Sequence, residues 1–314
     1  MRAHGRIFDS ILDTVGNTPL VRVNALAADA GCRGAVLAKL EFFNPIGSVK
    51  DRIAVAMIEA MEAAGDITEG STIVEPTAGN TGIGLAFVCA AKGLRSIFTM
   101  PEGFSQERIK LMRLLGAEVV LTPNEGGIAG AIQRANEIAA DLPGAVTPWQ
   151  YGNPANPDIH RRTTAEEIWR DTGGTVDAVV IGVGTGGTLS GVGAALKVLN
   201  PAIRIIAVEP ELSAVISGET PFPHTIQGIG TGFIPDVLDL DVIDEVMTVS
   251  DRSAIETARQ AARREGIPCG LSSGAALSCA LRLAAREEMA QKTIVTVLPS
   301  FAERYQTTAL FDCL

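Results

Sequence analysis

The residue best suited to covalent chemistry is Lys50, in the segment Asn44-Pro-Ile-Gly-Ser-Val-Lys-Asp-Arg52. Ser48 followed by Asp51 resembles a capping box, which predicts that a helix begins here with Lys50 in its first turn. Because the positive end of a helix dipole disfavours a second positive charge, we expect the pKa of Lys50 to lie below the ordinary ~10.4. A free amine of this kind forms Schiff bases. The alternative is an ordinary solvated surface lysine.

A glycine-rich turn, Gly182-Val-Gly-Thr-Gly-Gly-Thr188, follows an apolar run and precedes a helical pattern. The N–H groups and the positive dipole end of a helix N-terminus attract anions, so we expect a phosphate here. The glycine spacing also fits the dinucleotide pattern GxGxxG, with Glu209 where a ribose-binding acid would stand, which makes an NAD-dependent oxidoreductase a rival hypothesis. No Lys-Ser/Thr pair follows the glycines, which excludes a P-loop. A tight turn without a ligand is the third interpretation.

Two further loops place small polar residues before predicted helices. Glu75-Pro-Thr-Ala-Gly-Asn-Thr-Gly-Ile-Gly84 offers hydroxyl and amide groups to a carboxylate, although such residues are also common in turns and caps. Pro268-Cys-Gly-Leu-Ser-Ser-Gly-Ala-Ala276 contains serines that could simply cap a helix. A lysine, a phosphate loop, a carboxylate loop and a lone serine together are what pyridoxal phosphate requires.

These motifs lie in an alternation of strand-like and helix-like segments, which predicts parallel sheets. The predicted strands are 19–23, 35–40, 72–75, 96–100, 118–121, 178–183, 203–209 and 293–298. The predicted helices are 49–64, 81–92, 106–115, 128–140, 163–171, 189–199, 253–265 and 275–289. Because the strands are almost continuously apolar, we expect α/β domains of three layers, with mostly parallel sheets covered by helices on both faces.

The alternation lapses around residues 143–157, where Pro, Gly, Asn and aromatic residues gather. We interpret this segment as a crossing between two domains, for which 314 residues are sufficient. The predicted smaller N-terminal domain spans 46–152, and the larger domain is made of 12–45 and 153–314. The expected active site lies in the cleft between them.

Composition excludes several classes of function. With 26 Lys and Arg against 36 Asp and Glu, the net charge of −10 disfavours binding to nucleic acid or to anionic lipid. There is no apolar run near the ~18 residues of a membrane span and no signal-like N-terminus, so we expect a cytoplasmic protein without membrane association. The five cysteines lack CxxC spacing and the three histidines are scattered, so we expect neither a disulfide scaffold nor a metal site.

The order and wording of the motifs resemble the cysteine synthase (O-acetylserine sulfhydrylase) and cystathionine β-synthase family. The resemblance runs from Ile11-Leu-Asp-Thr-Val-Gly-Asn-Thr-Pro-Leu20 to Leu298-Pro-Ser-Phe-Ala-Glu-Arg-Tyr305. It implies the fold type II, tryptophan synthase β-like architecture and pyridoxal 5′-phosphate as cofactor. The cofactor-binding residues that it implies are Lys50, Asn80, Gly184, Thr185, Gly186, Gly187, Thr188 and Ser272. The substrate-binding residues that it implies are Thr77, Gly79, Asn80, Thr81, Gln150 and Gly228.

The resemblance also implies a role for each of these residues. Lys50 would carry the cofactor and later move protons, Asn80 would bond the ring oxygen, and residues 184–188 would hold the phosphate. The loop 77–81 and Gln150 would bind the substrate α-carboxylate, and Gly228 would flank the active-site mouth. Ser272 would face the pyridine nitrogen. Because a neutral serine does not keep that nitrogen protonated, the ring is a weaker electron sink, which favours loss of a β-leaving group over transamination.

The expected reaction is a β-replacement that converts O-acetyl-L-serine and sulfide to L-cysteine and acetate with ping-pong kinetics. Ala78 stands where most cysteine synthases carry serine, and this variant also resembles members linked to cystathionine formation. Cystathionine β-synthase-type and O-phosphoserine-dependent reactions therefore stay open as alternatives. The resemblance suggests a homodimer and a complex with serine acetyltransferase, whose C-terminal carboxylate would occupy the amino-acid site. A scaffold subunit that only binds such a carboxylate, without enzymatic activity, is the alternative outside the enzymes.

Overall fold

The computed structural model describes residues 7–312 except residues 78 and 104. The chain forms two compact units, which we call unit 1 and unit 2. Unit 1 contains Asn44–Trp149 together with the residues up to Gly16, and unit 2 contains Asn17–Phe43 together with the residues from Gln150 onwards. Residues 12–16 thus belong to unit 1 rather than to the larger unit predicted for them. The reason is local: the 3-10 helix η1 (Ile11–Thr14) packs on α3 (Asn80–Lys92), and the Gly16 N–H donates to Asn44 Oδ1 at 2.8 Å.

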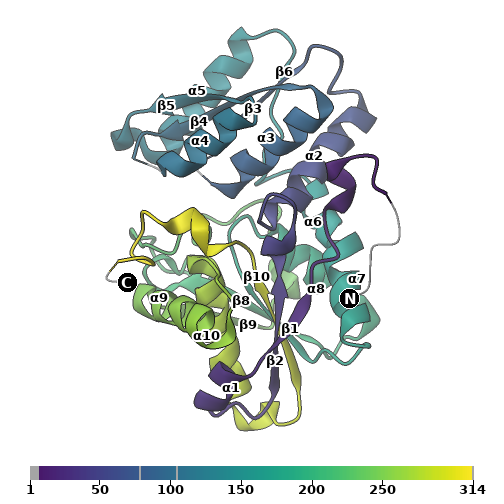
Figure 1. Ribbon diagram of the computed structural model, residues 1–314, viewed down its shortest axis with the longest axis vertical. Coiled ribbons are helices and arrows are strands. Elements are labelled where there is room, and N and C mark those ends of the chain that lie inside the picture. The colour runs from purple at the N-terminus through teal and green to yellow at the C-terminus, as the bar shows by residue number, and fades with distance from the viewer. Residues whose placement is uncertain (1–6, 78, 104, 313–314) are drawn as a thin grey trace. The chain divides into compact units, whose positions relative to one another are not determined.

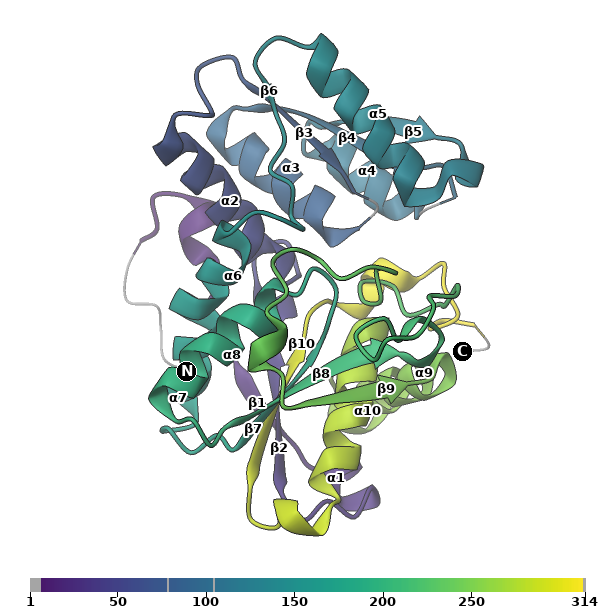
Figure 2. The same ribbon diagram turned by 180° about the vertical axis from the view of Figure 1, so that it is seen from behind.

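Unit 1 is built on a parallel sheet with the strand order β5-β4-β3-β6. Its strands are β3 (Thr72–Pro76), β4 (Arg95–Pro101), β5 (Glu118–Thr122) and β6 (Ala145–Val146). Its other helices are α2 (Lys50–Ala64), α4 (Gln106–Leu114), α5 (Gly127–Asp141) and the 3-10 helix η3 (Asn124–Gly126). Helix α5 covers one face of the sheet, and α3 and α4 lie on the other (Figures 1 and 2). The core beneath α5 contains Val74, Ile97 and Ala135.

Unit 2 is built on a mixed sheet with the strand order β1-β2-β10-β7-β8-β9. Its strands are β1 (Leu20–Val23), β2 (Ala35–Leu40), β7 (Ala178–Gly182), β8 (Arg204–Pro210), β9 (Glu245–Val249) and β10 (Thr293–Leu298). Among the described residues, the pairing of β1 with β2 is antiparallel and every other pairing is parallel. The α/β class with mostly parallel sheets is therefore confirmed.

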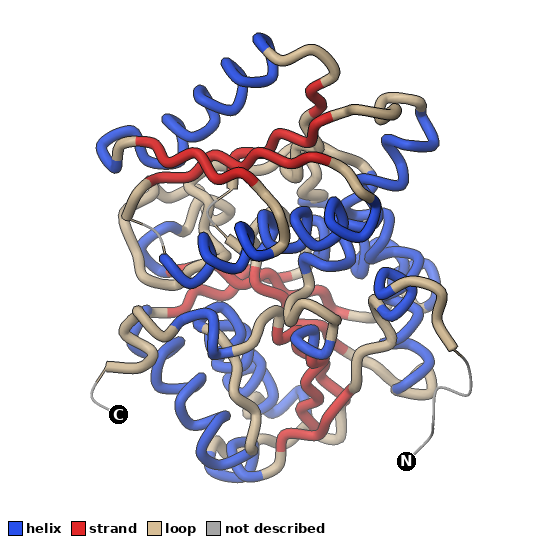
Figure 3. Tube along the Cα trace, turned by 45° about the horizontal axis from the view of Figure 1, so that its top comes forward, coloured by secondary structure: helices blue, strands red, loops and turns tan. Residues whose placement is uncertain are grey.

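The sheet of unit 2 has helices on both faces, as the tube view shows (Figure 3). Its α-helices are α1 (Ala25–Asp29), α6 (Ala155–Ile159), α7 (Ala165–Asp171), α8 (Gly187–Leu199), α9 (Asp251–Gln260) and α10 (Leu271–Ala284). Its 3-10 helices are η2 (Glu41–Phe43), η5 (Glu211–Ser213), η6 (Leu240–Val242), η8 (Glu287–Met289) and η9 (Ala302–Tyr305), and its π-helices are η4 (His160–Thr164) and η7 (Ala261–Glu265).

Alternate residues of the central strand β7 face opposite layers, as the two-residue period of a strand requires. Val180 belongs to the core beneath α9 and α10, whereas Val179 and Ile181 belong to the core beneath α7 and α8. All three side chains are almost completely buried. Burial on both faces explains why the strand reads as one continuous apolar run.

All eight predicted strands and all eight predicted helices are present, with ends displaced by a few residues. Among the described residues, two strands and two α-helices lie outside the prediction, namely β6, β9, α1 and α6, as do short 3-10 helices such as η1 and η9. Helix α6 was not predicted, because Pro154 and Pro157 lie at its start and suggested an irregular crossing. Proline is, however, tolerated in the first turn of a helix. The predicted helices 163–171 and 253–265 each include part or all of a π-helix.

Candidate functional site

Lys50 is the first residue of α2 in unit 1. It is half-buried, and desolvation lowers the pKa of its ammonium to about 8. The helix dipole predicts the same direction for this shift, whereas burial is its cause in the structure. Lys50 is therefore not an ordinary solvated lysine.

The turn before Lys50 differs from the predicted capping box. The N-cap is Val49, and Ser48 lies one residue earlier, where its Oγ accepts from the Lys50 N–H at 3.2 Å. The buried Asp51 carboxylate reaches past the N-cap and accepts from the Ile46 N–H at 2.8 Å and from Ser48 Oγ at 3.3 Å. The turn is thus wrapped around a buried carboxylate that fixes the backbone entering Lys50.

Helix α3 packs closely against the start of α2. A Cβ built on Gly84 would lie 3.0 Å from the Lys50 carbonyl oxygen and 3.2 Å from Ala54 Cβ. Glycine at this position therefore allows α3 to pack closely against the first turn of α2. This packing brings the loop before α3 near Lys50 within unit 1.

The loop 77–80 connects β3 to α3. The buried Thr77 Oγ1 accepts from the Gly82 N–H at 3.1 Å and so caps the helix, as the simpler interpretation of this loop expected. Gly79 is the N-cap, Asn80 begins the helix half-buried, and Thr81 is buried. A helix N-terminus lined by hydroxyl and amide groups suits a carboxylate ligand. Ala78 lies outside the described residues.

The glycine-rich loop of unit 2 runs from the end of β7 into α8, as predicted. A Cβ on Gly184 would lie 2.3 Å from the Gly228 carbonyl oxygen, and one on Gly187 would lie 1.9 Å from Asn156 Oδ1. Gly186 has a φ of +87° and serves as the N-cap of α8. The loop is thus a cradle that admits no side chain at these positions. Thr185 and Thr188 supply hydroxyls beside the helix N-terminus, so the residues present fit a phosphate group.

Gly228 and Ser272 lie beside this loop. Gly228 has a φ of +100°, and a Cβ built on it would lie 3.5 Å from Ser272 Oγ. Ser272 is buried in the first turn of α10, whose N-cap is Gly270. The fold therefore brings Gly184, Gly228 and Ser272 together from three segments far apart in the sequence.

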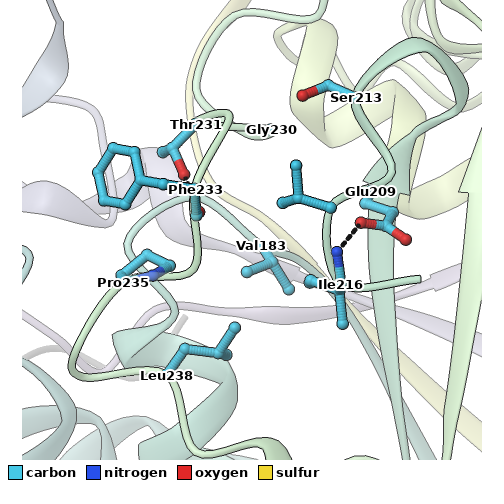
Figure 4. Close-up of a pocket in the computed structure, with 10 residues that line it drawn as sticks. Val183, Glu209, Ser213, Ile216, Gly230, Thr231, Phe233, Pro235 and Leu238 are labelled. Atoms are coloured by element: carbon cyan, nitrogen blue, oxygen red, sulfur yellow. Dashed lines mark hydrogen bonds between the residues drawn. The ribbon is translucent and has the colours of Figure 1, made fainter. Parts of the chain in front are cut away.

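Glu209 does not fit the dinucleotide hypothesis. Its buried carboxylate accepts from the Ile216 N–H at 2.8 Å (Figure 4). It also accepts from the Ser217 N–H at 3.1 Å and from Ser217 Oγ at 2.6 Å. These bonds hold the loop that follows β8 and leave the carboxylate engaged within the protein. The neighbouring pocket is lined mainly by apolar residues, including Val183, Ile216 and Phe233.

The predicted site residues fall into two sets. Unit 1 contains Lys50, Thr77, Gly79, Asn80 and Thr81. Unit 2 contains Gln150, Gly184, Thr185, Gly186, Gly187, Thr188, Gly228 and Ser272. Sequence reasoning missed Asn156 and His160, which contact Thr185 and Thr188. Their spacing of four residues could have placed both on one face of a helix. No helix was predicted there, because the segment is rich in proline and was interpreted as a crossing between domains.

Among the described residues, no group of three or more metal-ligating side chains occurs, and no helix is long and apolar enough to cross a membrane. Within residues 7–312, the cysteines are free thiols. Burial raises the pKa of Cys89 and of Cys269 to about 12, which makes both thiols poor nucleophiles at neutral pH.

Comparison with known proteins gives consistent results. The family model described as "Pyridoxal-phosphate dependent enzyme" matches residues 11–300. A cysteine synthase of Staphylococcus aureus is 51% identical over 305 residues, which cover 97% of each chain. The crystal structure of a cysteine synthase from Entamoeba histolytica superposes with a TM-score of 0.97 at 42% identity, covering 100% of this chain and 94% of that one. An O-acetylserine-dependent cystathionine β-synthase from Helicobacter pylori gives a TM-score of 0.91 at 40% identity, covering 98% and 99%.

Proposed function

The chain belongs to the family of pyridoxal-phosphate-dependent enzymes, and from this premise we propose that it acts as an O-acetylserine sulfhydrylase, or cysteine synthase. The reaction replaces the acetate of O-acetyl-L-serine by sulfide and yields L-cysteine and acetate. The observation that carries the proposal is Lys50, an amine of lowered pKa in a chain that resembles cysteine synthases over nearly its full length.

When bound, pyridoxal phosphate supplies an electron sink for negative charge at the substrate α-carbon. Lys50 Nζ would hold the cofactor covalently and, once released, would take the substrate α-proton and return it at the end of the cycle. The pKa of about 8 supports this role, because the fraction of free amine at neutral pH is far larger than for a lysine of pKa ~10.4.

The remaining residues would orient the cofactor and the substrate. The backbone N–H groups of residues 184–188, with the hydroxyls of Thr185 and Thr188, would hold the phosphate. Asn80 would bond the ring oxygen. Ser272 would face the pyridine nitrogen as a neutral partner, which favours elimination at Cβ over transamination.

The substrate α-carboxylate would bind at the start of α3, where Thr77, Gly79, Asn80 and Thr81 are clustered, together with Gln150. The helix N-terminus supports this assignment, because its N–H groups and dipole favour a negative charge. Gly228 would flank the entrance for the amino acid.

Cystathionine formation is the second candidate function. The likeness to the Helicobacter pylori enzyme, whose description names O-acetylserine as its donor, favours it. Ala78 in the carboxylate loop is consistent with the same reaction. Both candidates use one donor and differ in the acceptor, which is sulfide in the first and homocysteine in the second.

We also propose that the protein is a cytoplasmic homodimer that binds the C-terminal carboxylate of serine acetyltransferase in its amino-acid site. The free thiols of the described cysteines are consistent with a reducing compartment. Sedimentation of the purified protein tests the dimer. Competition between a C-terminal peptide of the transferase and O-acetylserine tests the complex.

The decisive experiment adds O-acetylserine to the purified, cofactor-loaded protein without sulfide. We expect an immediate change in the visible absorbance that reverses when sulfide is added. Steady-state rates are then compared for O-acetylserine, O-phosphoserine and serine as donors, each with sulfide and with homocysteine. A protein that does not bind pyridoxal phosphate would refute the proposal, and a large preference for homocysteine would replace it by the second candidate.

A further inference from the structure

Two buried side chains from one helical segment contact the two threonines of the glycine-rich loop. Asn156 on α6 places Nδ2 3.1 Å from Thr185 Oγ1, and His160, which begins the π-helix η4, places Nε2 3.1 Å from Thr188 Oγ1. Asn156 is 0% exposed and His160 is 1% exposed. Residues four apart lie on the same face of a helix, so both side chains point at the loop from one direction.

Glycines of α8 allow this close approach. A Cβ on Gly187 would collide with Asn156 Oδ1 at 1.9 Å, and one on Gly191 would lie 2.1 Å from the Pro157 carbonyl oxygen and 2.9 Å from His160 Cβ. Helix α8 therefore packs against α6 and η4 through backbone atoms at these two glycines. The segment 155–164 packs directly against the loop and the first turns of α8.

The direction of the first contact follows from the partners of Asn156. Its Nδ2 also lies 2.8 Å from the Gln150 carbonyl oxygen, which can only accept a hydrogen bond, so the amide orientation is fixed. Asn156 Nδ2 therefore donates to Thr185 Oγ1. The hydroxyl proton of Thr185 is then directed away from Asn156.

The second contact belongs to a chain of three groups. His160 Nδ1 lies 2.9 Å from Thr164 Oγ1, which is fully buried, and Nε2 lies 3.1 Å from Thr188 Oγ1. A phosphate group accepts hydrogen bonds, so Thr188 must donate its proton to a bound phosphate and accept from Nε2–H. In a neutral imidazole with its proton on Nε2, Nδ1 accepts the proton of Thr164.

We propose that Asn156 and His160 are positioning residues that turn the hydroxyl protons of Thr185 and Thr188 toward the cofactor phosphate. Thr164 fixes the tautomer of His160 with the proton on Nε2. The inference rests on the proposed function in one respect, namely that residues 184–188 hold that phosphate. A π-helix at this position is in keeping with its frequent occurrence at functional sites.

The first test compares pyridoxal phosphate with pyridoxal, which lacks the phosphate. Dissociation constants of both are measured with the cofactor-free full-length protein for Thr164→Val, and for Thr163→Val as a matched control. Thr163 Oγ1 donates to the Ile159 carbonyl oxygen in the same segment. We expect Thr164→Val to reduce the preference for the phosphorylated form about five- to tenfold, as loss of one hydrogen bond between neutral groups would, and Thr163→Val to leave the preference unchanged.

Further variants separate positioning from packing. His160→Gln retains a donor near the position of Nε2 and should recover most of the phosphate preference that His160→Leu loses. In the Thr188→Val background, Thr164→Val should have no further effect, because the hydroxyl through which it acts is gone. Additive effects of the two valine substitutions would show that Thr164 does not act through His160 and Thr188, and would overturn the proposal.

A spectroscopic readout needs no variant of the site. With ¹⁵N-labelled histidine in the cofactor-loaded protein, His160 should show a protonated Nε2 and an unprotonated Nδ1. A proton on Nδ1, or equal phosphate preference in wild type and Thr164→Val, overturns the inference and leaves the proposed function standing. A wild-type protein that binds pyridoxal as tightly as pyridoxal phosphate would instead refute the phosphate loop and, with it, both proposals.

Discussion

Lys39 and Glu167 form an ion pair buried inside unit 2, with Nζ 2.7 Å from Oε2. The Lys39 side chain is 0% exposed, and its Nζ also donates to the Thr18 carbonyl oxygen at 2.5 Å. The pair joins β2 to α7 and contacts the motif Gly16-Asn-Thr-Pro-Leu20, because Glu167 Oε1 also accepts from the Asn17 N–H at 2.9 Å. Burial makes such a pair sensitive to loss of either charge.

The Lys39→Met variant should lower the free energy of unfolding by about 3–5 kcal/mol, because the Glu167 carboxylate then stays buried without this cation. Adding Glu167→Gln should restore a substantial part, since the amide oxygen can still accept from the Asn17 N–H. Lys292→Met, which removes a partly exposed pair with Asp177, should cost about 1 kcal/mol or less. Urea denaturation measures all three, and equal losses in Lys39→Met and Lys292→Met would contradict the prediction.

Lys50 should react as an amine with a pKa of about 8 in the cofactor-free protein. Protonation blocks nucleophilic attack, so its acylation rate should rise with pH to half its maximum near pH 8. A lysine in an unstructured reference peptide should reach half-maximum near pH ~10.4. Mass spectrometry of peptides after brief acylation measures both, and coincident curves would show that burial does not lower the pKa of Lys50.

Replacement of Lys50 by alanine should lower the rate of cysteine formation by about 10²–10⁴-fold, the usual range for loss of a general acid–base group. The visible absorbance of the covalently held cofactor should disappear as well. Lys110→Ala removes an exposed lysine of α4 and should leave both properties unchanged. Retention of the visible band in Lys50→Ala would assign the covalent linkage to another residue.

Gly184 and Gly130 make a matched pair for testing the phosphate cradle. In Gly184→Ala the new methyl group would lie 2.3 Å from the Gly228 carbonyl oxygen, so the loop must shift and cofactor affinity should fall at least tenfold. Gly130 lies within α5 with no atom within 4 Å of its Cβ position, so Gly130→Ala should raise stability by about 0.5–1 kcal/mol through helix propensity. Titration with pyridoxal phosphate and thermal unfolding measure the two effects. Unchanged affinity in Gly184→Ala would remove the cradle from the cofactor site.

Ser272→Asp should change the course of the reaction rather than only its rate. A carboxylate beside the pyridine nitrogen favours its protonated form, which strengthens the electron sink and prolongs the life of the α-carbon charge. We expect the yield of pyridoxamine phosphate, which only transamination produces, to rise relative to cysteine in Ser272→Asp and to stay low in Ser272→Ala. Product analysis by chromatography gives the ratio, and the same ratio in both variants would place Ser272 away from the ring nitrogen.

The sequence alone was sufficient for the α/β class and for the elements that carry Lys50, the loop 77–81 and the glycine-rich turn. These predictions rest on local chemistry: apolar runs for buried strands, helical periodicity, and small polar residues at helix starts. The edge strand β9 and the short helix α6 were not predicted. Strand β9 lies at the edge of its sheet among charged residues, and α6 contains prolines.

Only the tertiary structure decided how these residues are used. Burial, which depends on residues distant in sequence, lowers the pKa of Lys50, and the turn before it is wrapped around Asp51 rather than closed by a capping box. The sequence places Glu209 where it could bind a ribose, but in the structure its carboxylate accepts hydrogen bonds from the loop that follows β8. Asn156 and His160 contact Thr185 and Thr188 only because α8 packs against their segment in the folded chain. Local patterns determine which groups are present, whereas desolvation and hydrogen-bond partners arise from contacts that the folded chain alone creates.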